Sequence, residues 1–121
     1  MNCKIIVVEN FKREAKRLVK KFVSLRDELR QLEKELLRNP HCGTPLGKGV
    51  YKIRLAVKSK GSGKSGGLRV ITRTVEIQMQ VMEQSPQTDI YLLSIYDKAE
   101  QSAIADKQLK SLINSILFES E

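Results

Sequence analysis

The chain contains no tryptophan, and aromatic residues of all kinds make up only 5% of it. A sequence this poor in aromatic side chains is not suited to a large stacking platform for single-stranded nucleic acid. Its two cysteines, Cys3 and Cys42, are too few for a disulfide framework. The apolar run Ile5–Val8 is too short for a signal-peptide core, and no segment approaches the roughly 18 apolar residues of a membrane span. These absences predict a reduced, cytoplasmic protein with no membrane partner.

Acidic residues are missing from one long stretch of the chain. No Asp or Glu lies between Leu36 and Val75, and the net charge of the whole chain is +8. The basic residues of this middle segment are Arg38, Lys48, Lys52, Arg54, Lys58, Lys60, Lys64, Arg69 and Arg73. Charges elsewhere nearly cancel, so the excess is local. A local basic patch indicates a phosphate-rich or acidic partner, although a basic surface that serves only solubility is the alternative.

The length of 121 residues and the 40% apolar content suit a single domain, residues 1–121, with one modest core. Hydrophobic periodicity predicts seven elements in the order β, α, α, β, β, β, α. They are a strand at Lys4–Val8, helices at Phe11–Phe22 and Ser24–Arg38, strands at Val50–Lys58, Leu68–Val75 (extending through Met82) and Ile90–Tyr96, and a helix at Ala105–Phe118. The expected fold class is α+β. A mostly antiparallel four-stranded sheet carries the helical hairpin on one face, and a helix closes the chain.

Alternation along the strands predicts which side chains share a face of the sheet. Lys52 and Arg54 leave one face, opposite to the apolar residues between them. The apolar parity changes between Val70 and Val75, which predicts a bulge or a break in that strand. Tyr91 and Tyr96 have opposite parity and are therefore expected on opposite faces.

Two short motifs resemble nucleotide-binding loops, but their context is wrong. Gly61–Gly66 has the letters of a dinucleotide fingerprint, and Gly63-Lys64-Ser65 resembles the end of a P-loop. Both motifs require a helix immediately afterwards, whereas Leu68–Val75 is strand-like. His41-Cys42 has no second ligand cluster, so a solvated loop histidine is favoured over a metal site. No cofactor and no metal are expected.

The basic residues of the strands suggest a site for one phosphate. Lys52 and Arg54 share a face, Arg69 begins the next strand, and Lys98 follows the Ile90–Tyr96 strand. A guanidinium can hold two phosphate oxygens and stabilise charge that develops in phosphoryl transfer. A lysine among other cations has a lowered pKa and exchanges protons near neutral pH. RNA supplies its own 2′-OH nucleophile, so these residue types suit RNA cleavage. A binding surface without cleavage stays open as the alternative.

Three strings carry a resemblance to a known family. Tyr51-Lys-Ile-Arg-Leu, Lys64-Ser-Gly-Gly-Leu-Arg-Val-Ile and Ile90-Tyr-Leu-Leu-Ser-Ile-Tyr-Asp-Lys resemble the RelE/ParE toxin superfamily, most closely its HigB-type, RelE-like branch. The resemblance covers about Ile5 to Ile113. It implies a RelE-like fold and a type II toxin that cleaves mRNA on the ribosome. It also implies an inhibitory antitoxin protein, expected to be acidic and encoded next to the toxin.

The resemblance assigns roles to individual residues. It implies that Lys52, Arg54, Arg69 and Lys98 handle the phosphate and the proton transfers. RNA contacts are expected from the rest of the basic segment and the adjacent strand end, namely Lys48, Lys58, Lys60, Lys64, Arg73 and Tyr96. RelE also uses a C-terminal tyrosine, where this chain has Ile104, so the general base is left open. A ParE-type gyrase inhibitor and a non-catalytic RNA- or antitoxin-binding module are the alternative functions.

Overall fold

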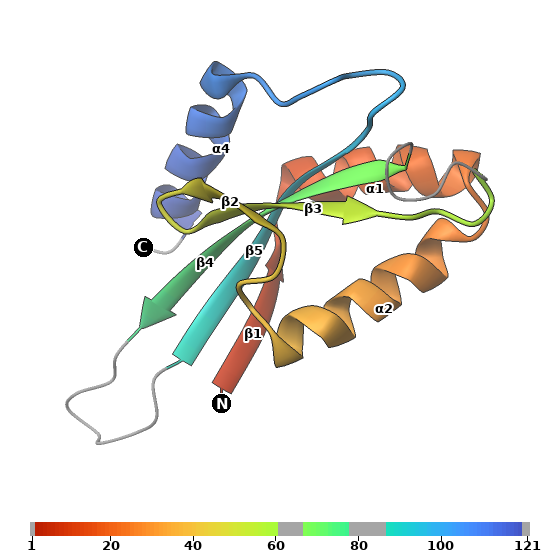
Figure 1. Cartoon of the computed structure of the whole chain (residues 1–121). Helices are drawn as coiled ribbons and strands as arrows, with labels where there is room; N and C mark the ends of the chain where they lie inside the picture. The colour runs from red at the N-terminus through yellow and green to blue at the C-terminus, as the bar shows by residue number, and fades with distance from the viewer. Residues whose placement is uncertain (1, 61–66, 78–86, 120–121) are drawn as a thin grey trace.

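The computed structural model describes residues 2–60, 67–77 and 87–119, which form three helices and a five-stranded sheet (Figure 1). The elements are β1 (Asn2–Val7), α1 (Glu9–Lys21), α2 (Leu25–Arg38), β2 (Thr44–Gly47), β3 (Val50–Leu55), β4 (Leu68–Ile77), β5 (Gln87–Asp97) and α4 (Asp106–Glu119). The predicted α+β class is confirmed. The expected extension of β4 to Met82 lies outside the described residues.

The sheet is mixed and has one strand more than predicted. Its strand order is β1-β5-β4-β3-β2, with β1 parallel to β5 and every other neighbouring pair antiparallel. The unpredicted strand, β2, is four exposed residues long and contains Pro45 and Gly47. Proline and glycine are tolerated in a short edge strand. Because both residues are typical of loops, the sequence pattern does not predict a strand there. Gly49 makes the turn into β3 possible, because its φ is +75° and an added Cβ would lie 2.8 Å from the Thr74 carbonyl oxygen.

A bulge interrupts the pairing of the two longest strands, β4 and β5. Ile71 pairs with Ser94 whereas Thr72 pairs with Leu92, so one β5 residue is extra. The predicted irregularity between Val70 and Val75 is therefore confirmed.

The bulge also decides where the two β5 tyrosines lie. Tyr96 pairs with Arg69, and Tyr91 pairs with Arg73, which is four residues further along the same strand. Directly paired residues share a face, so both tyrosines lie on the face of the two arginines. The prediction of opposite faces is wrong because simple alternation takes no account of the extra residue.

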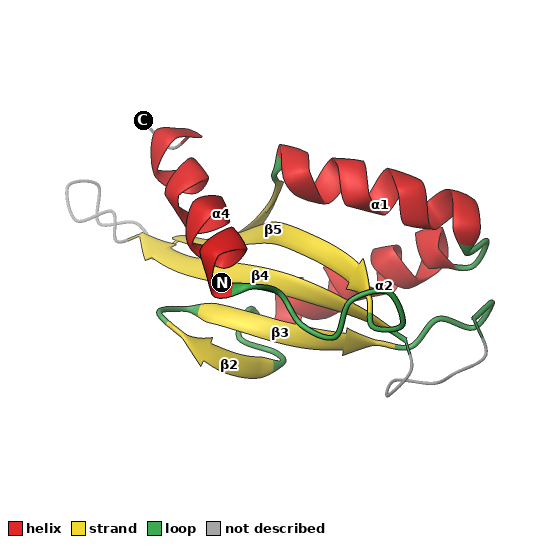
Figure 2. Ribbon diagram, turned by 90° about the horizontal axis from the view of Figure 1, so that it is seen from above, coloured by secondary structure: helices red, strands yellow, loops and turns green. Residues whose placement is uncertain are grey.

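Helices cover both faces of the sheet (Figure 2). Leu32 of α2 lines a pocket with Ile53 and Leu55 of β3, which places α2 on that face. Val50 has the opposite parity on β3, and it lines a pocket with Leu109 and Ile113 of α4. Helix α4 therefore covers the face of Lys52 and Arg54 at its Val50 end, because the apolar stripe of α4 buries itself there.

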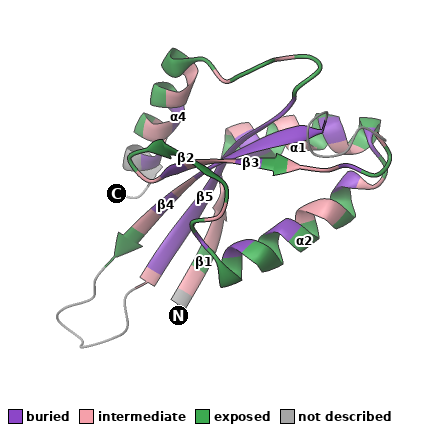
Figure 3. Ribbon diagram, in the orientation of Figure 1, coloured by how far each residue is buried: buried purple, intermediate pink, exposed green. Residues whose placement is uncertain are grey.

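Helix α1 lies along β5 beyond the end of β1. Its Asn10 side chain donates to the Leu93 carbonyl oxygen, and Glu14 accepts from the Ser94 hydroxyl and the Ile95 N–H. The bonds to the Leu93 carbonyl and the Ile95 N–H supply partners for backbone groups of β5 beyond the part that pairs with β1. β5 is buried along nearly its whole length (Figure 3), as suits a strand whose segment Ile90–Tyr96 is almost entirely apolar.

The start of α2 is linked to the segment that follows β3. Ser24 has helical backbone angles and makes no side-chain cap. Its hydroxyl instead contacts Glu28, and it accepts the Ser59 N–H at 3.0 Å. Glu28 also accepts the Lys58 N–H at 2.7 Å. The hairpin turn is therefore tied to the segment after β3, and this bond competes with capping.

Candidate phosphate-binding site

The pairing of β3 with β4 brings three of the predicted site residues together. Arg54 lies directly opposite Arg69, and Lys52 lies opposite Ile71, one pair along on the same face. Side chains of directly paired residues start from Cβ atoms about 4.5–5.5 Å apart. Tyr96 extends the row, because it pairs with Arg69 on the other side. The row Arg54, Arg69, Tyr96, with Lys52 beside it, is called the arginine row below.

The three cations of this site differ in exposure. Arg54 is exposed, Lys52 is half-buried, and Arg69 is only 4% exposed. Arg69 donates from Nη1 to the Leu68 carbonyl oxygen at 3.2 Å. Among the residues that the structure describes, no carboxylate forms a salt bridge with Lys52 or Arg54. Like charges directly opposite one another destabilise a sheet, so an anion between them would relieve that cost.

Tyr96 contributes a neutral hydroxyl to the arginine row. Burial raises the pKa of Tyr96, and the positive charge of Arg69 and a hydrogen bond from the Ile104 N–H oppose this rise only in part. A phenol with a raised pKa stays protonated at neutral pH and is not a general base there. Tyr96 is therefore suited to a hydrogen bond with an anion, as the predicted RNA-contact role requires.

Lys98 reaches the same end of the sheet by following β5. Its N–H donates to the Gly67 carbonyl oxygen at 3.4 Å, directly before β4, and the residue is exposed. Lys98 is thus close in the chain to the paired ends of both strands, whereas Lys52 and Arg54 come from β3. The sheet gathers all four predicted catalytic residues at one end.

Lys60 lies where an RNA contact is not expected. Its ammonium forms an ion pair with Asp97, and the two side chains are only 13% and 2% exposed. The same ammonium lies 5.9 Å from the centre of the Phe22 ring. Burial acts to raise the pKa of Asp97, but hydrogen bonds from Lys60 and the Ala99 N–H and the nearby positive charges outweigh it and lower the pKa. The geometry gives Lys60 a structural role in place of the predicted RNA contact.

The other predicted RNA contacts are dispersed. Lys58 is exposed beyond β3, and Lys48 occupies the exposed β2–β3 turn with a φ of +55°. Arg73 pairs with Val50, four residues along β4 from Arg69, and its Nε is buried without a hydrogen-bond partner among the described residues. Lys64 lies outside the described residues. Lys48 and Arg73 therefore lie toward the end of the β3–β4 pairing opposite to Arg54 and Arg69.

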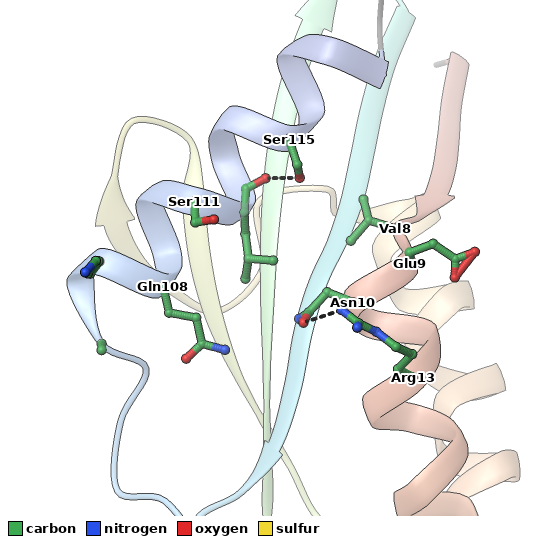
Figure 4. Close-up of a pocket in the computed structure, with 10 residues that line it drawn as sticks. Val8, Glu9, Asn10, Arg13, Gln108, Ser111 and Ser115 are labelled. Atoms are coloured by element: carbon green, nitrogen blue, oxygen red, sulfur yellow. Dashed lines mark hydrogen bonds between the residues drawn. The ribbon is translucent and has the colours of Figure 1, made fainter.

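Sequence reasoning missed two polar features. His41 contacts the Tyr51 hydroxyl at 2.9 Å through Nδ1 and the Glu76 carboxylate at 3.3 Å through Nε2, on the opposite face of β3. A pocket of about 630 Å³ also separates the start of α1 from α4; Asn10 and Arg13 line one side, and Gln108 and Ser111 the other (Figure 4). Neither could be found locally, because both join residues that are distant in the chain.

Comparison with protein families and the search for other site types add few constraints. No protein-family model matches the chain. Within the described ranges, no group of three or more His, Cys, Asp or Glu side chains could hold a metal ion. None of the described helices has the length and apolar character needed to cross a membrane.

Proposed function

We propose that the protein is a ribosome-dependent mRNA endonuclease, the toxin of a type II toxin–antitoxin pair. The observation that carries the proposal is the direct pairing of Arg54 with Arg69, with Lys52 on the same face. The strings that resemble HigB-type, RelE-like toxins contain these same residues. An acidic antitoxin is the expected protein partner, since the basic segment presents the complementary charge.

The chemistry follows from the residue types. A neutral lysine amine takes the proton of the 2′-OH, and the 2′-oxygen then forms a bond to phosphorus. Arg69 is fixed by its bond to the Leu68 carbonyl, and with Arg54 it stabilises the added charge of the pentavalent phosphate. The bond from phosphorus to the 5′-oxygen breaks, and a protonated lysine, Lys98 or Lys52, returns a proton to that oxygen. The products are a 2′,3′-cyclic phosphate and a 5′-hydroxyl.

The test is to express the protein in bacteria and map mRNA ends. The wild type should arrest growth and create new 5′-hydroxyl ends within translated regions. Lys52→Ala/Arg54→Ala/Arg69→Ala should abolish both effects. The matched control, Arg26→Ala/Arg30→Ala/Lys34→Ala, removes the same charge from exposed positions of α2 and should leave both effects intact. Full toxicity in the first triple variant would contradict the proposal, and a DNA damage response without mRNA cleavage would favour a ParE-type gyrase inhibitor.

A non-catalytic binding module is the second candidate, and the 4% exposure of Arg69 favours it. A guanidinium covered in this way cannot reach a phosphate without movement of its surroundings. In that case Arg54→Ala should weaken salt-dependent binding of purified protein to RNA, with no cleavage by the wild type. Arg54 suits this measurement because it is exposed and its loss should leave the fold intact.

A further inference from the structure

The segment between β5 and α4, residues 98–105, crosses the sheet on the face that carries the arginine row and is called the strap here. It runs on the same side of the sheet as α4 (Figures 1 and 2). The Ile104 side chain packs against the core, and its backbone lies near enough to Tyr96 to act on the pKa of the phenol. Tyr96 and its partner Arg69 are each only 4% exposed. The strap therefore lies against the buried part of the site, Tyr96 and Arg69, which the proposed reaction needs open.

One side chain near the start of the strap ties it to α1. The Glu100 carboxylate accepts hydrogen bonds from both terminal nitrogens of Arg17, at 3.3 and 3.4 Å, and lies 3.7 Å from the Lys21 ammonium. All three side chains are about half exposed. Exposed ion pairs are weak, so this tether can be exchanged for another anion at little cost.

The two cations that hold Glu100 belong to a larger basic surface. The exposed basic residues of α1 are Lys12, Arg13, Lys16, Arg17, Lys20 and Lys21. Like charges four residues apart on a helix repel each other. Within the described residues, Glu100 is the only carboxylate in a salt bridge with any of them. A phosphate backbone offers many negative charges to this surface and can displace a single carboxylate.

We propose that Glu100 is an electrostatic latch, and that a nucleic-acid phosphate backbone bound to α1 releases it. Displacement of Glu100 from Arg17 and Lys21 frees the strap, which then uncovers Tyr96 and Arg69. A ligand shifts such an equilibrium only through its different affinity for the two states, and here the closed state lacks two of the cations that the backbone would bind. The inference rests on the proposed function in that RNA is the natural ligand, and it makes the nuclease site accessible only when RNA is bound.

The experiment measures hydrogen exchange of the Ile104 amide, because Ile104 is the strap residue that packs against the core in the closed strap. The probe is a single-stranded oligonucleotide with 2′-deoxy sugars, which carries the phosphates but cannot undergo 2′-OH cleavage. In the wild type, the oligonucleotide or high salt should accelerate exchange by roughly two- to fivefold, the range expected from exposed ion pairs. Glu100→Gln should show the faster exchange without either. The control Glu33→Gln, at an exposed α2 position, should behave like the wild type.

A charge swap sharpens the test. Arg17→Glu/Glu100→Arg should restore slow exchange and reduce the response to the oligonucleotide. Unchanged Ile104 exchange in Glu100→Gln, fast exchange in the swap, or an oligonucleotide that does not bind or binds without accelerating exchange would each overturn the latch. The two proposals can fail separately. If the strap opens but the protein does not cleave RNA, the nuclease proposal is contradicted and the latch is supported. If the protein cleaves RNA but the strap does not respond, the latch is contradicted and the nuclease proposal is supported.

Discussion

The two faces of the sheet differ in how their charged residues are arranged. The face beneath α2 carries Ile53 and Val70, and its edge is closed by the Lys60–Asp97 ion pair, in which each charge has a partner. The opposite face carries Arg54 and Arg69 directly paired, and a surface ion pair links the strap on that face to α1. The first arrangement favours stability. The second arrangement lowers stability, because it places two positive charges side by side. Such a concentration of positive charge is typical of a site that binds an anion.

The largest expected effect tests the apolar packing of the first face. Leu36 of α2 is 0% exposed, and Leu36→Ala should lower the free energy of unfolding by about 2–5 kcal/mol, because it leaves a cavity in the core. Its neighbour Leu37 is 45% exposed, so Leu37→Ala should change stability by less than about 1 kcal/mol. Urea denaturation measures both. Similar losses in the two variants would show that α2 does not pack as described.

The next effect concerns the ion pair at the edge of that face. Asp97→Asn should cost about 3 kcal/mol, because it leaves the largely buried Lys60 ammonium without a counter-charge. The lowered pKa of Asp97 means that its stabilisation is present above the unfolded pKa of about 3.9 and is lost as the pH falls through the folded value.

Unfolding measured against pH checks this assignment. The wild type should lose more stability than Asp97→Asn between neutral pH and the acid range, so the two curves should converge as Asp97 is protonated. Asp27→Asn is the matched control, since the Asp27 side chain is 81% exposed and should add little at any pH. Parallel curves for the wild type and Asp97→Asn would assign the acid sensitivity to other carboxyl groups.

The smallest effect has the opposite sign and belongs to the second face. Arg54→Gln removes the like-charge pair with Arg69 and should raise the free energy of unfolding by about 0.2–1 kcal/mol, while it weakens RNA binding. Arg26→Gln on exposed α2 should change neither property appreciably. Thermal denaturation and a binding titration on the same samples provide the comparison. If Arg54→Gln were less stable than the wild type, the arginine pair would stabilise the fold, and the prediction would be wrong.

Much of this architecture follows from local pattern. The hydrophobic period and the residues at the helix ends were sufficient to predict α1, α2 and α4 within a few residues. An amphipathic helix or strand places its apolar residues at a characteristic spacing, which can be recognised in the sequence. The change in the parity of the apolar residues between Val70 and Val75 predicted the bulge. The concentration of basic residues, and the common face of Lys52 and Arg54, are likewise properties of the sequence alone.

Other features depend on which distant segments meet, and only the tertiary structure decided them. Pairing register placed Arg69 opposite Arg54 and moved Tyr91 to the face of Tyr96. Tertiary packing left Arg69 only 4% exposed, and a long-range ion pair with Asp97 engages Lys60, one of the expected RNA contacts. Spacing fixes the direction of a side chain relative to its own strand. Exposure and partners depend on elements far away in the chain, whose arrangement no local period encodes.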